Sequence, residues 1–135
     1  MKNERGSALV ITLLLLWILT AIGVYAVSTA TNEIDVTLQS KVGTVTLNAA
    51  EAGTYVAIDQ IPNVVTASSA TLSNNASYVV TSVYTGHSIT PGYAVNLRFA
   101  NYDTNSQGSA PPSFVARRTI LAVADFGPVP IGTMY

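Results

Sequence analysis

The sequence predicts an α+β protein in which a long N-terminal helix packs on a small antiparallel β-sheet. Three observations predict this fold class. An uncharged apolar run extends from Ala8 to Val27, a helical spacing of apolar residues continues to about Asp59, and segments rich in Val and Tyr alternate with turn residues after Pro62. With 135 residues, the chain has room for one globular domain and an appended helix.

The first predicted element is a helix of membrane-spanning length. The uncharged run from Ala8 to Val27 is 20 residues long, and at about 1.5 Å per residue it spans roughly 30 Å, the thickness of a hydrocarbon core. Lys2 and Arg5 precede it and Glu33 is the first charge after it, so the positive-inside rule places the N-terminus in the cytoplasm and exports the remainder. The alternative is a secretory signal peptide cleaved within "YAVSTA".

The second predicted element is an amphipathic helix that continues the first. The apolar stripe consists of Ile34, Leu38, Val42, Val45, Ala49, Ala52 and Val56. A polar stripe on another face consists of Glu33, Thr37, Lys41, Thr44, Asn48 and Glu51. Because proline disfavours helical geometry in the residue before it, Ile61-Pro62 predicts a helix end near Asp59. Gly23 and Gly43 are candidate bends within the helix.

After Pro62 the sequence predicts a loop and then strands. Residues 63–77 are rich in small polar side chains and predict a linker. Residues 77–84, 93–102 and 114–126 are rich in Val, Tyr, Phe, Ile and Thr and predict strands. In the second of these, one apolar face is expected from the alternating residues Tyr93, Val95, Leu97 and Phe99. An antiparallel sheet packed on the apolar stripe of the helix would bury both surfaces.

The composition excludes several kinds of site. The chain has no cysteine, which rules out disulfides, thiolate metal ligands and attached c-type haem, and its formal net charge of −1 offers no basic face for nucleic acid. His87 is the only histidine and is interpreted as a surface or turn residue. Asp103 and Asp125 are the only carboxylates after residue 60, so we expect no enzyme activity, no cofactor and no metal site. Residues 103–108 are interpreted as a polar turn, because Phe114 stands where a calcium loop needs Glu.

The N-terminal half resembles a known family. The stretch "ERGSALVITLLLLWILTAIGVYAVSTATNE", followed by "NAAEAG" at residues 48–53, is similar to the N-terminal domain of PilX-type minor pilins, members of the type IV pilin superfamily. The resemblance covers about residues 2–58. It implies that prepilin peptidase cuts after Gly6, that Ser7 becomes an N-methylated terminus, and that the helix first anchors the subunit in the bacterial inner membrane and then enters a filament core.

The resemblance also assigns roles along the helix. It implies that Gly23 is a place where the helix loosens on assembly. The filament core is expected to include Leu9, Ile11, Leu14, Trp17 and Ile18. One departure concerns Ile11, because most pilins carry Glu five residues into the mature chain, where it neutralises a neighbouring terminal amine. The subunit therefore has a special place in the filament or another acceptor, and Glu4 is the candidate acceptor if the leader is retained.

Four segments follow from these observations: a leader over residues 1–6, a transmembrane and filament-core helix over 7–31, an amphipathic helix over 32–60 and a β-sheet head over 61–135. The expected partners are copies of the chain or other pilins, prepilin peptidase, the assembly machinery and the inner membrane, and no nucleic acid. These predictions are consistent both with a main subunit of the filament and with a minor or initiating subunit. The alternative is a single-pass membrane protein with an exported β-domain that does not polymerise.

Overall fold

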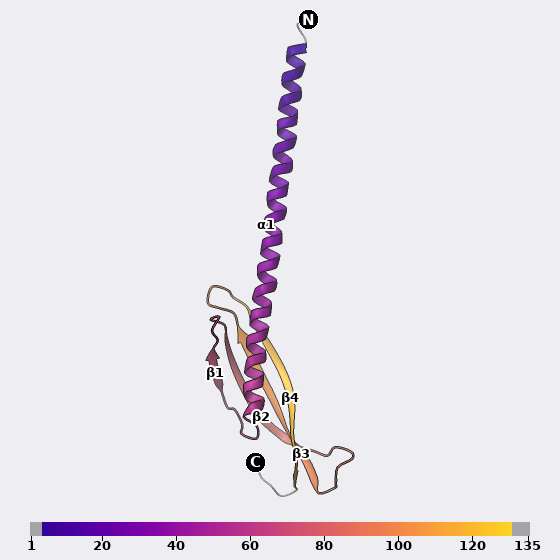
Figure 1. Ribbon diagram of the computed structural model, residues 1–135, viewed down its shortest axis with the longest axis vertical. Helices are drawn as coiled ribbons and strands as arrows, with labels where there is room; N and C mark the ends of the chain where they lie inside the picture. Colours follow the sequence, from indigo (N-terminus) through magenta and orange to yellow (C-terminus); the bar gives the residue numbers. More distant parts are fainter. Residues whose placement is uncertain (1–3, 131–135) are drawn as a thin grey trace. The chain divides into compact units, whose positions relative to one another are not determined.

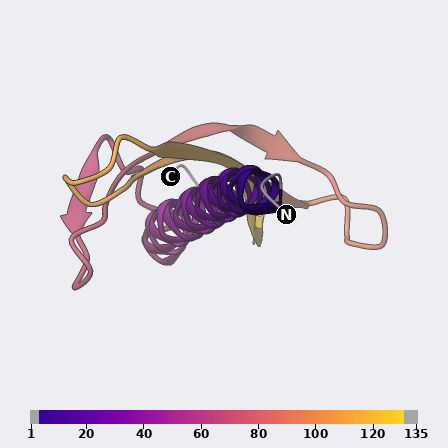
Figure 2. The same ribbon diagram turned by 90° about the horizontal axis from the view of Figure 1, so that it is seen from above.

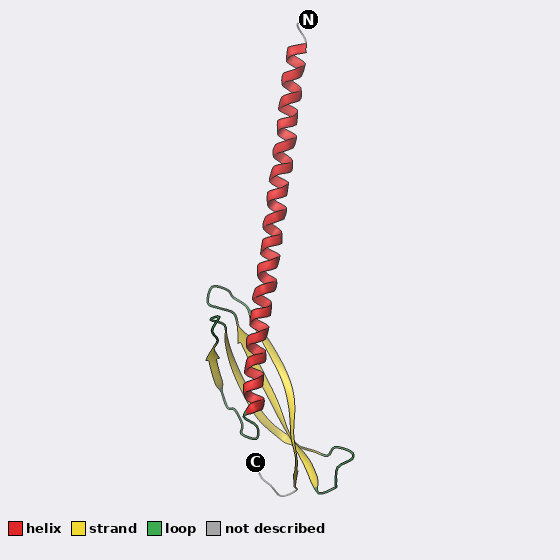
Figure 3. Ribbon diagram, in the orientation of Figure 1, coloured by secondary structure: helices red, strands yellow, loops and turns green. Residues whose placement is uncertain are grey.

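The computed structural model describes residues 4–130 and confirms the α+β fold class. One helix and four strands follow each other along the chain: α1 (Glu4–Asp59), β1 (Ser68–Thr71), β2 (Ser77–Ser88), β3 (Leu97–Ser109) and β4 (Arg117–Pro130). The strands form one antiparallel sheet in the order β1-β2-β3-β4 (Figure 1). Figure 3 separates the helix from the strands by colour. The helix ends at Asp59, as the following Ile61-Pro62 predicts.

The chain divides into two compact units, Met1–Ser40 and Lys41–Tyr135, with the boundary inside α1. In the first unit every described side chain from Gly6 to Ser40 is exposed. In the second unit the last turns of α1 lie on one face of the sheet, and the opposite face carries no other described segment of that unit (Figure 2). The sheet therefore has an inner face against α1 and an outer face.

The core of the second unit lies between α1 and the inner face of β2 and β3. Ala57, Val65, Tyr78 and Val80 form a buried apolar cluster, and Ala52, Val56 and Leu72 pack against it. Two polar side chains of this face of the sheet bond to main-chain carbonyls. Ser106 Oγ donates to the Ala50 carbonyl at 2.7 Å, and Tyr102 Oη donates to the Pro62 carbonyl at 3.0 Å. The core of the head is thus small and partly polar, and hydrogen bonds fix α1 to the sheet.

The packing face of α1 differs from the predicted apolar stripe. Ile34 and Leu38 are exposed, and of the seven predicted residues only Ala49 is fully buried. The buried residues of α1 are small ones: Thr46, Ala49, Ala50, Gly53, Thr54 and Ala57. The predicted polar stripe, in contrast, is exposed at all of its positions. The stripe prediction followed the larger aliphatic side chains, whereas close packing of the helix on the sheet selects the smallest ones.

Two glycines explain how close this packing is. A Cβ at Gly53 would lie 2.8 Å from Tyr78 Cδ2 and closer still to Ser106 Oγ. A Cβ at Gly108 of β3 would lie 2.6 Å from the Ala50 nitrogen and closer still to the Thr46 carbonyl oxygen. Since real Cβ atoms do not approach other atoms this closely, α1 and β3 can meet only because both positions are glycine.

Several strand predictions are corrected by the structure. β3 begins at Leu97 rather than Tyr93, and residues 103–108, interpreted as a turn, belong to the second half of this strand. The expected apolar face of this segment is also wrong, because its buried residues are Ala100, Tyr102, Thr104, Ser106 and Gly108. The predicted linker over 63–77 contains β1, and the last strand runs over 117–130 rather than 114–126. Pairing with β2 and β4 overrides the turn preference of Asn, Asp, Ser and Gly in this segment.

Candidate functional site

The candidate functional site is the apolar surface of α1 in the first unit. Its large apolar side chains are all exposed: Leu9, Val10, Ile11, Leu13, Leu14, Leu15, Leu16, Trp17, Ile18, Leu19, Ile22, Val24, Tyr25 and Val27. No charged residue occurs from Gly6 to Asn32. By length and composition this helix is able to cross a membrane, and none of the apolar window is buried in the structure. A continuous apolar surface of this size requires lipid or protein around it.

The threonine hydroxyl groups in this segment are bonded to the helix itself. Thr20, Thr29 and Thr31 each donate to the carbonyl four residues earlier, at 2.8 Å, 3.0 Å and 2.9 Å, and Thr12 donates to the Leu9 carbonyl at 2.9 Å. A threonine bonded in this way presents its methyl group outward and leaves no unsatisfied donor. The helix can therefore lie in a hydrocarbon environment without a desolvation penalty at these positions.

The five residues predicted for the filament core do not share one face of α1. At about 100° per residue, Ile11, Leu14 and Ile18 fall on one side of the helix, while Leu9 falls nearly opposite Ile11. Trp17 lies between the two sides. All five are exposed, so the structure does not single them out from the other apolar residues of this segment. Because the helix is apolar all around, several faces are equally available to neighbours.

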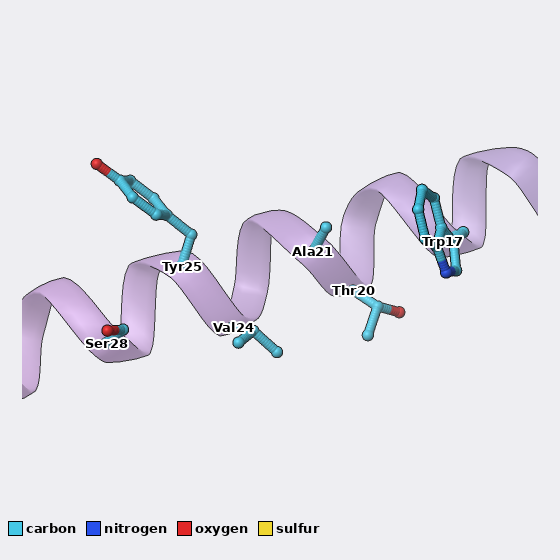
Figure 4. A pocket seen from close by; sticks show the side chains of 6 residues that line it. All are labelled: Trp17, Thr20, Ala21, Val24, Tyr25 and Ser28. Atoms are coloured by element: carbon cyan, nitrogen blue, oxygen red, sulfur yellow. The ribbon is translucent and has the colours of Figure 1, made fainter.

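One face carries a shallow groove that the sequence reading missed. The groove is lined by Trp17, Thr20, Ala21, Val24, Tyr25 and Ser28 (Figure 4). The small residues Ala21 and Ser28 alternate there with the large rings of Trp17 and Tyr25, which makes ridges and a depression along the helix. In the sequence, these residues follow one another at steps of three and four, which indicates that they share one face of a helix. Small side chains between large ones are typical of surfaces where another helix packs closely.

The predicted processing residues lie at the start of α1. Gly6 and Ser7 are both helical and exposed, and no atom lies within 4 Å of a Cβ built at Gly6. The first three residues of the predicted leader lie outside the described residues. Gly23, the predicted loosening site, is helical and surrounded by open space. In this single chain α1 is therefore unbroken at Gly23, and loosening on assembly stays a prediction.

The head offers little for small-molecule chemistry. His87 lies in β2 rather than in a turn, is exposed, and its Nδ1 lies 2.6 Å from Tyr84 Oη in a hydrogen bond. Within the part of the chain that the structure describes, no group of three or more His, Cys, Asp or Glu side chains is placed to hold a metal ion. Arg117 and Arg118 are exposed at the start of β4. The apolar helix is thus the feature that calls for a functional explanation.

Comparisons with known proteins identify no relative of this chain. The chain matches no family model, no curated protein and no solved structure. The structural conclusions are therefore the α+β fold and an apolar N-terminal helix able to span a membrane.

Proposed function

We propose that this chain is a structural subunit of a type IV pilus-like filament. In this proposal the helix anchors the subunit in the bacterial inner membrane with its N-terminus in the cytoplasm. Cleavage after Gly6 and N-methylation of Ser7 then allow the subunit to join an extracellular filament through the same helix. The partners are other copies or other pilins, prepilin peptidase and the assembly machinery.

The observation that carries the proposal is the exposed apolar surface of α1 between Gly6 and Val27, joined to a helix end that is fixed to a small sheet. An anchor alone needs an apolar surface, which this segment has on every side. The groove at Ala21 and Ser28 adds a shape suited to contact with another helix. The bonded threonines make the segment compatible both with lipid and with a packed helix bundle.

Ile11 supports a particular place for the subunit. In the proposed mature chain it is the fifth residue, and it is an exposed apolar side chain. It offers no carboxylate for the terminal amine of a neighbour, and an unpaired ammonium in an apolar environment is costly. A minor or initiating position, where fewer neighbours surround the terminus, avoids this cost. A main subunit would need a different acceptor.

The proposal is tested by placing a charge in the helix. Leu14→Lys puts an ammonium into a surface that either lipid or packed helices must cover, and neither solvates it, so the variant is expected to form no filaments. The matched control is Val36→Lys, at another exposed apolar position of the same helix, beyond the uncharged run. Filaments sheared from cells are counted by electron microscopy, and the membrane-bound fraction is measured in parallel.

A second variant separates assembly from anchoring. Ala21→Trp fills the groove but stays apolar, so the chain should remain in the membrane while filament formation falls; Leu19→Trp, at a site that is already large, is its control. Normal filaments in both Leu14→Lys and Ala21→Trp would contradict the proposal. A chain that is found in membranes but never in sheared filaments would support the non-polymerising single-pass alternative.

A further inference from the structure

The outer face of the sheet carries exposed apolar side chains that no described helix or loop of their own unit covers. Successive side chains of a strand alternate between faces, and those opposite the buried Thr104, Ser106 and Gly108 face outward. The exposed aliphatic residues of this face are Val79 (49%), Val83 (57%), Leu121 (77%) and Val123 (69%). Val79 and Val83 lie on β2, and Leu121 and Val123 lie on β4, so exposed apolar side chains flank the polar residues of β3 on both sides.

The strand register arranges this face in rows across β2, β3 and β4. Ser77, Ser109 and Arg117 form the first row, and Val79, Gln107 and Thr119 the second. Thr81, Asn105 and Leu121 form the third row, and Val83, Asp103 and Val123 the fourth. Asp103 therefore lies between Val83 and Val123. These three residues line a shallow groove together with Thr81 and Thr85.

The first and the fourth of these rows carry opposite charges. Asp103 and Arg117 are both exposed, and the structure gives neither of them an ion-pair partner among the described residues. The rows that hold them are six residues apart along the strands, which is about 20 Å at the usual rise per residue. Each charge is therefore too far from the other to pair within one chain. Arg118 pairs with Gly108 and so belongs to the inner face.

We propose that this outer face binds the same face of a second copy of the chain. A two-fold axis parallel to the sheet and perpendicular to its strands places the first row of each copy over the fourth row of the other. Arg117 of one copy then lies over Val123 of the other, with its aliphatic stem on the valine and its guanidinium beside Asp103 on the next strand. The pair forms twice, because an isologous interface repeats every contact.

The same two-fold rotation brings the two middle rows into contact. The second row of one copy lies over the third row of the other, so Gln107 faces Asn105 and Thr119 faces Leu121. Amide side chains can exchange hydrogen bonds, and Leu121 gains cover that it lacks in the single chain. Opposite charges therefore meet in this arrangement, and the four aliphatic residues are covered by Ser77, Thr81, Thr119 and the stem of Arg117. In an arrangement without reversal of the strands, Asp103 on the central strand would face Asp103 of the other copy, which is repulsive.

The size of the face sets the strength of the contact. Three strands and four rows cover roughly 350 Å² per copy, well below the ~800 Å² per partner of a stable complex. The contact should therefore be weak between dilute chains and form where copies are held close together, as in a shared membrane or micelle. The inference does not depend on filament formation, because it requires only copies of the chain at high local concentration.

Cross-linking of the full chain tests the arrangement, since the sequence has no cysteine of its own. One copy carries Asn105→Cys and the other Gln107→Cys, and a short bismaleimide is applied in membranes or detergent. These positions are expected to form a cross-linked dimer. The matched control is Val83→Cys in both copies, which the two-fold axis keeps about 20 Å apart along the strands, and which should give little dimer.

Charge reversal tests the pairing itself. In cysteine-bearing copies, Asp103→Arg alone or Arg117→Asp alone should lower the dimer yield roughly tenfold, because two attractive pairs become two repulsive ones. A mixture of an Asp103→Arg copy with an Arg117→Asp copy should restore it, since both pairs are then opposite in sign. Equal yield from the Val83→Cys control, unchanged yield in the single reversals, or no recovery in the mixture would each overturn the inference.

Discussion

At the scale of single residues, two glycines decide how the head is built. Gly53 on α1 and Gly108 on β3 leave no room for a side chain, because backbone and ring atoms of the opposing element occupy the space. Gly43, on the same helix, has open space around it. The three glycines look alike in the sequence but have different roles, since only two of them lie where the helix and the sheet touch.

Gly53→Ala is therefore expected to destabilise the head by about 1–3 kcal/mol, because the added methyl group forces α1 away from Tyr78 and Ser106. Gly43→Ala is the matched control and should leave stability unchanged or raise it by up to about 1 kcal/mol through helix propensity. Urea unfolding of the detergent-solubilised chain, followed by the signal of the β-sheet, measures both. Equal stability of the two variants would contradict the close contact.

Thr104 is a second informative residue. Its side chain is buried, and its Oγ1 has no hydrogen-bond partner among the described residues. Thr104→Val keeps the shape and removes the unpaired hydroxyl, so the free energy of unfolding should rise by about 1 kcal/mol. Ser106→Ala is the contrasting variant on the same face of β3. It removes the bond to the Ala50 carbonyl and should lower the free energy of unfolding by about 1 kcal/mol. The same unfolding experiment tests this opposite pair of signs.

At the scale of elements, α1 combines two kinds of helix. From Gly6 to Ser40 all of its side chains are exposed, and from Lys41 to Asp59 one face is covered by the sheet. The first part owes its helicity to local preference and to internal hydrogen bonds, including those of the threonines. The second part is also held by tertiary contacts. A local helix breaker therefore has more effect in the first part.

Gly23 is the expected weak point of the first part. Glycine costs about 1 kcal/mol relative to alanine in a helix, and Ile22, Val24 and Val27 add β-branched penalties. In lipid the helix should stay continuous, because an open backbone group there is costly. Among packed helices, the hydroxyls of Thr20 and Thr29 could exchange their present bonds to Leu16 and Tyr25 for bonds to freed carbonyls. We expect local loosening in the assembled state.

Gly23→Ala tests this expectation, and the open space around Gly23 means that the methyl group itself disturbs nothing. The variant should assemble with a more continuous helix and with less extension under force. A filament density map and a stretching measurement provide the comparison with the unmodified chain. Unbroken helical density from Ile18 to Ser28 in the unmodified filament would reject the idea, as would an unchanged rise and stretch in the variant.

At the scale of the whole molecule, the main expectation is processing. Cleavage after Gly6 removes Lys2, Glu4 and Arg5, which changes six basic and seven acidic side chains to four and six, a formal charge of −2. The intact mass of the exported protein should match a chain that begins at Ser7, in which a methyl group replaces one hydrogen of the terminal amine. Exported protein that still carries residues 1–6 would contradict this processing.

Gly6→Leu is expected to block maturation, because a peptidase must approach the backbone closely at the cleaved bond. Since no atom lies within 4 Å of a Cβ built at Gly6, the effect cannot come from a clash within the helix. Ala8→Leu, two residues further along, is the matched control and should be processed normally. The ratio of precursor to mature chain on an immunoblot measures both variants.

The sequence by itself determined the α+β class, the apolar helix of membrane-spanning length, its end at Asp59 and the exposed polar stripe. These features depend on runs and spacings within one segment, and local periodicity reports them directly. A proline after the helix or an unbroken apolar run has the same meaning in almost any tertiary context. The processing site, the filament core and the filament itself stay predictions from the resemblance.

Only the tertiary structure decided which face of α1 packs, where β1 and β3 begin and end, and which side chains share the outer face of the sheet. Thr46, Ala50 and Gly53 carry little hydrophobic signal, yet they are buried because a helix can approach a sheet closely only through small residues. Residues 103–108 have turn-forming side chains but become a strand because β2 and β4 pair with them on both sides. Such pairing joins residues far apart in the chain, so no local pattern contains it.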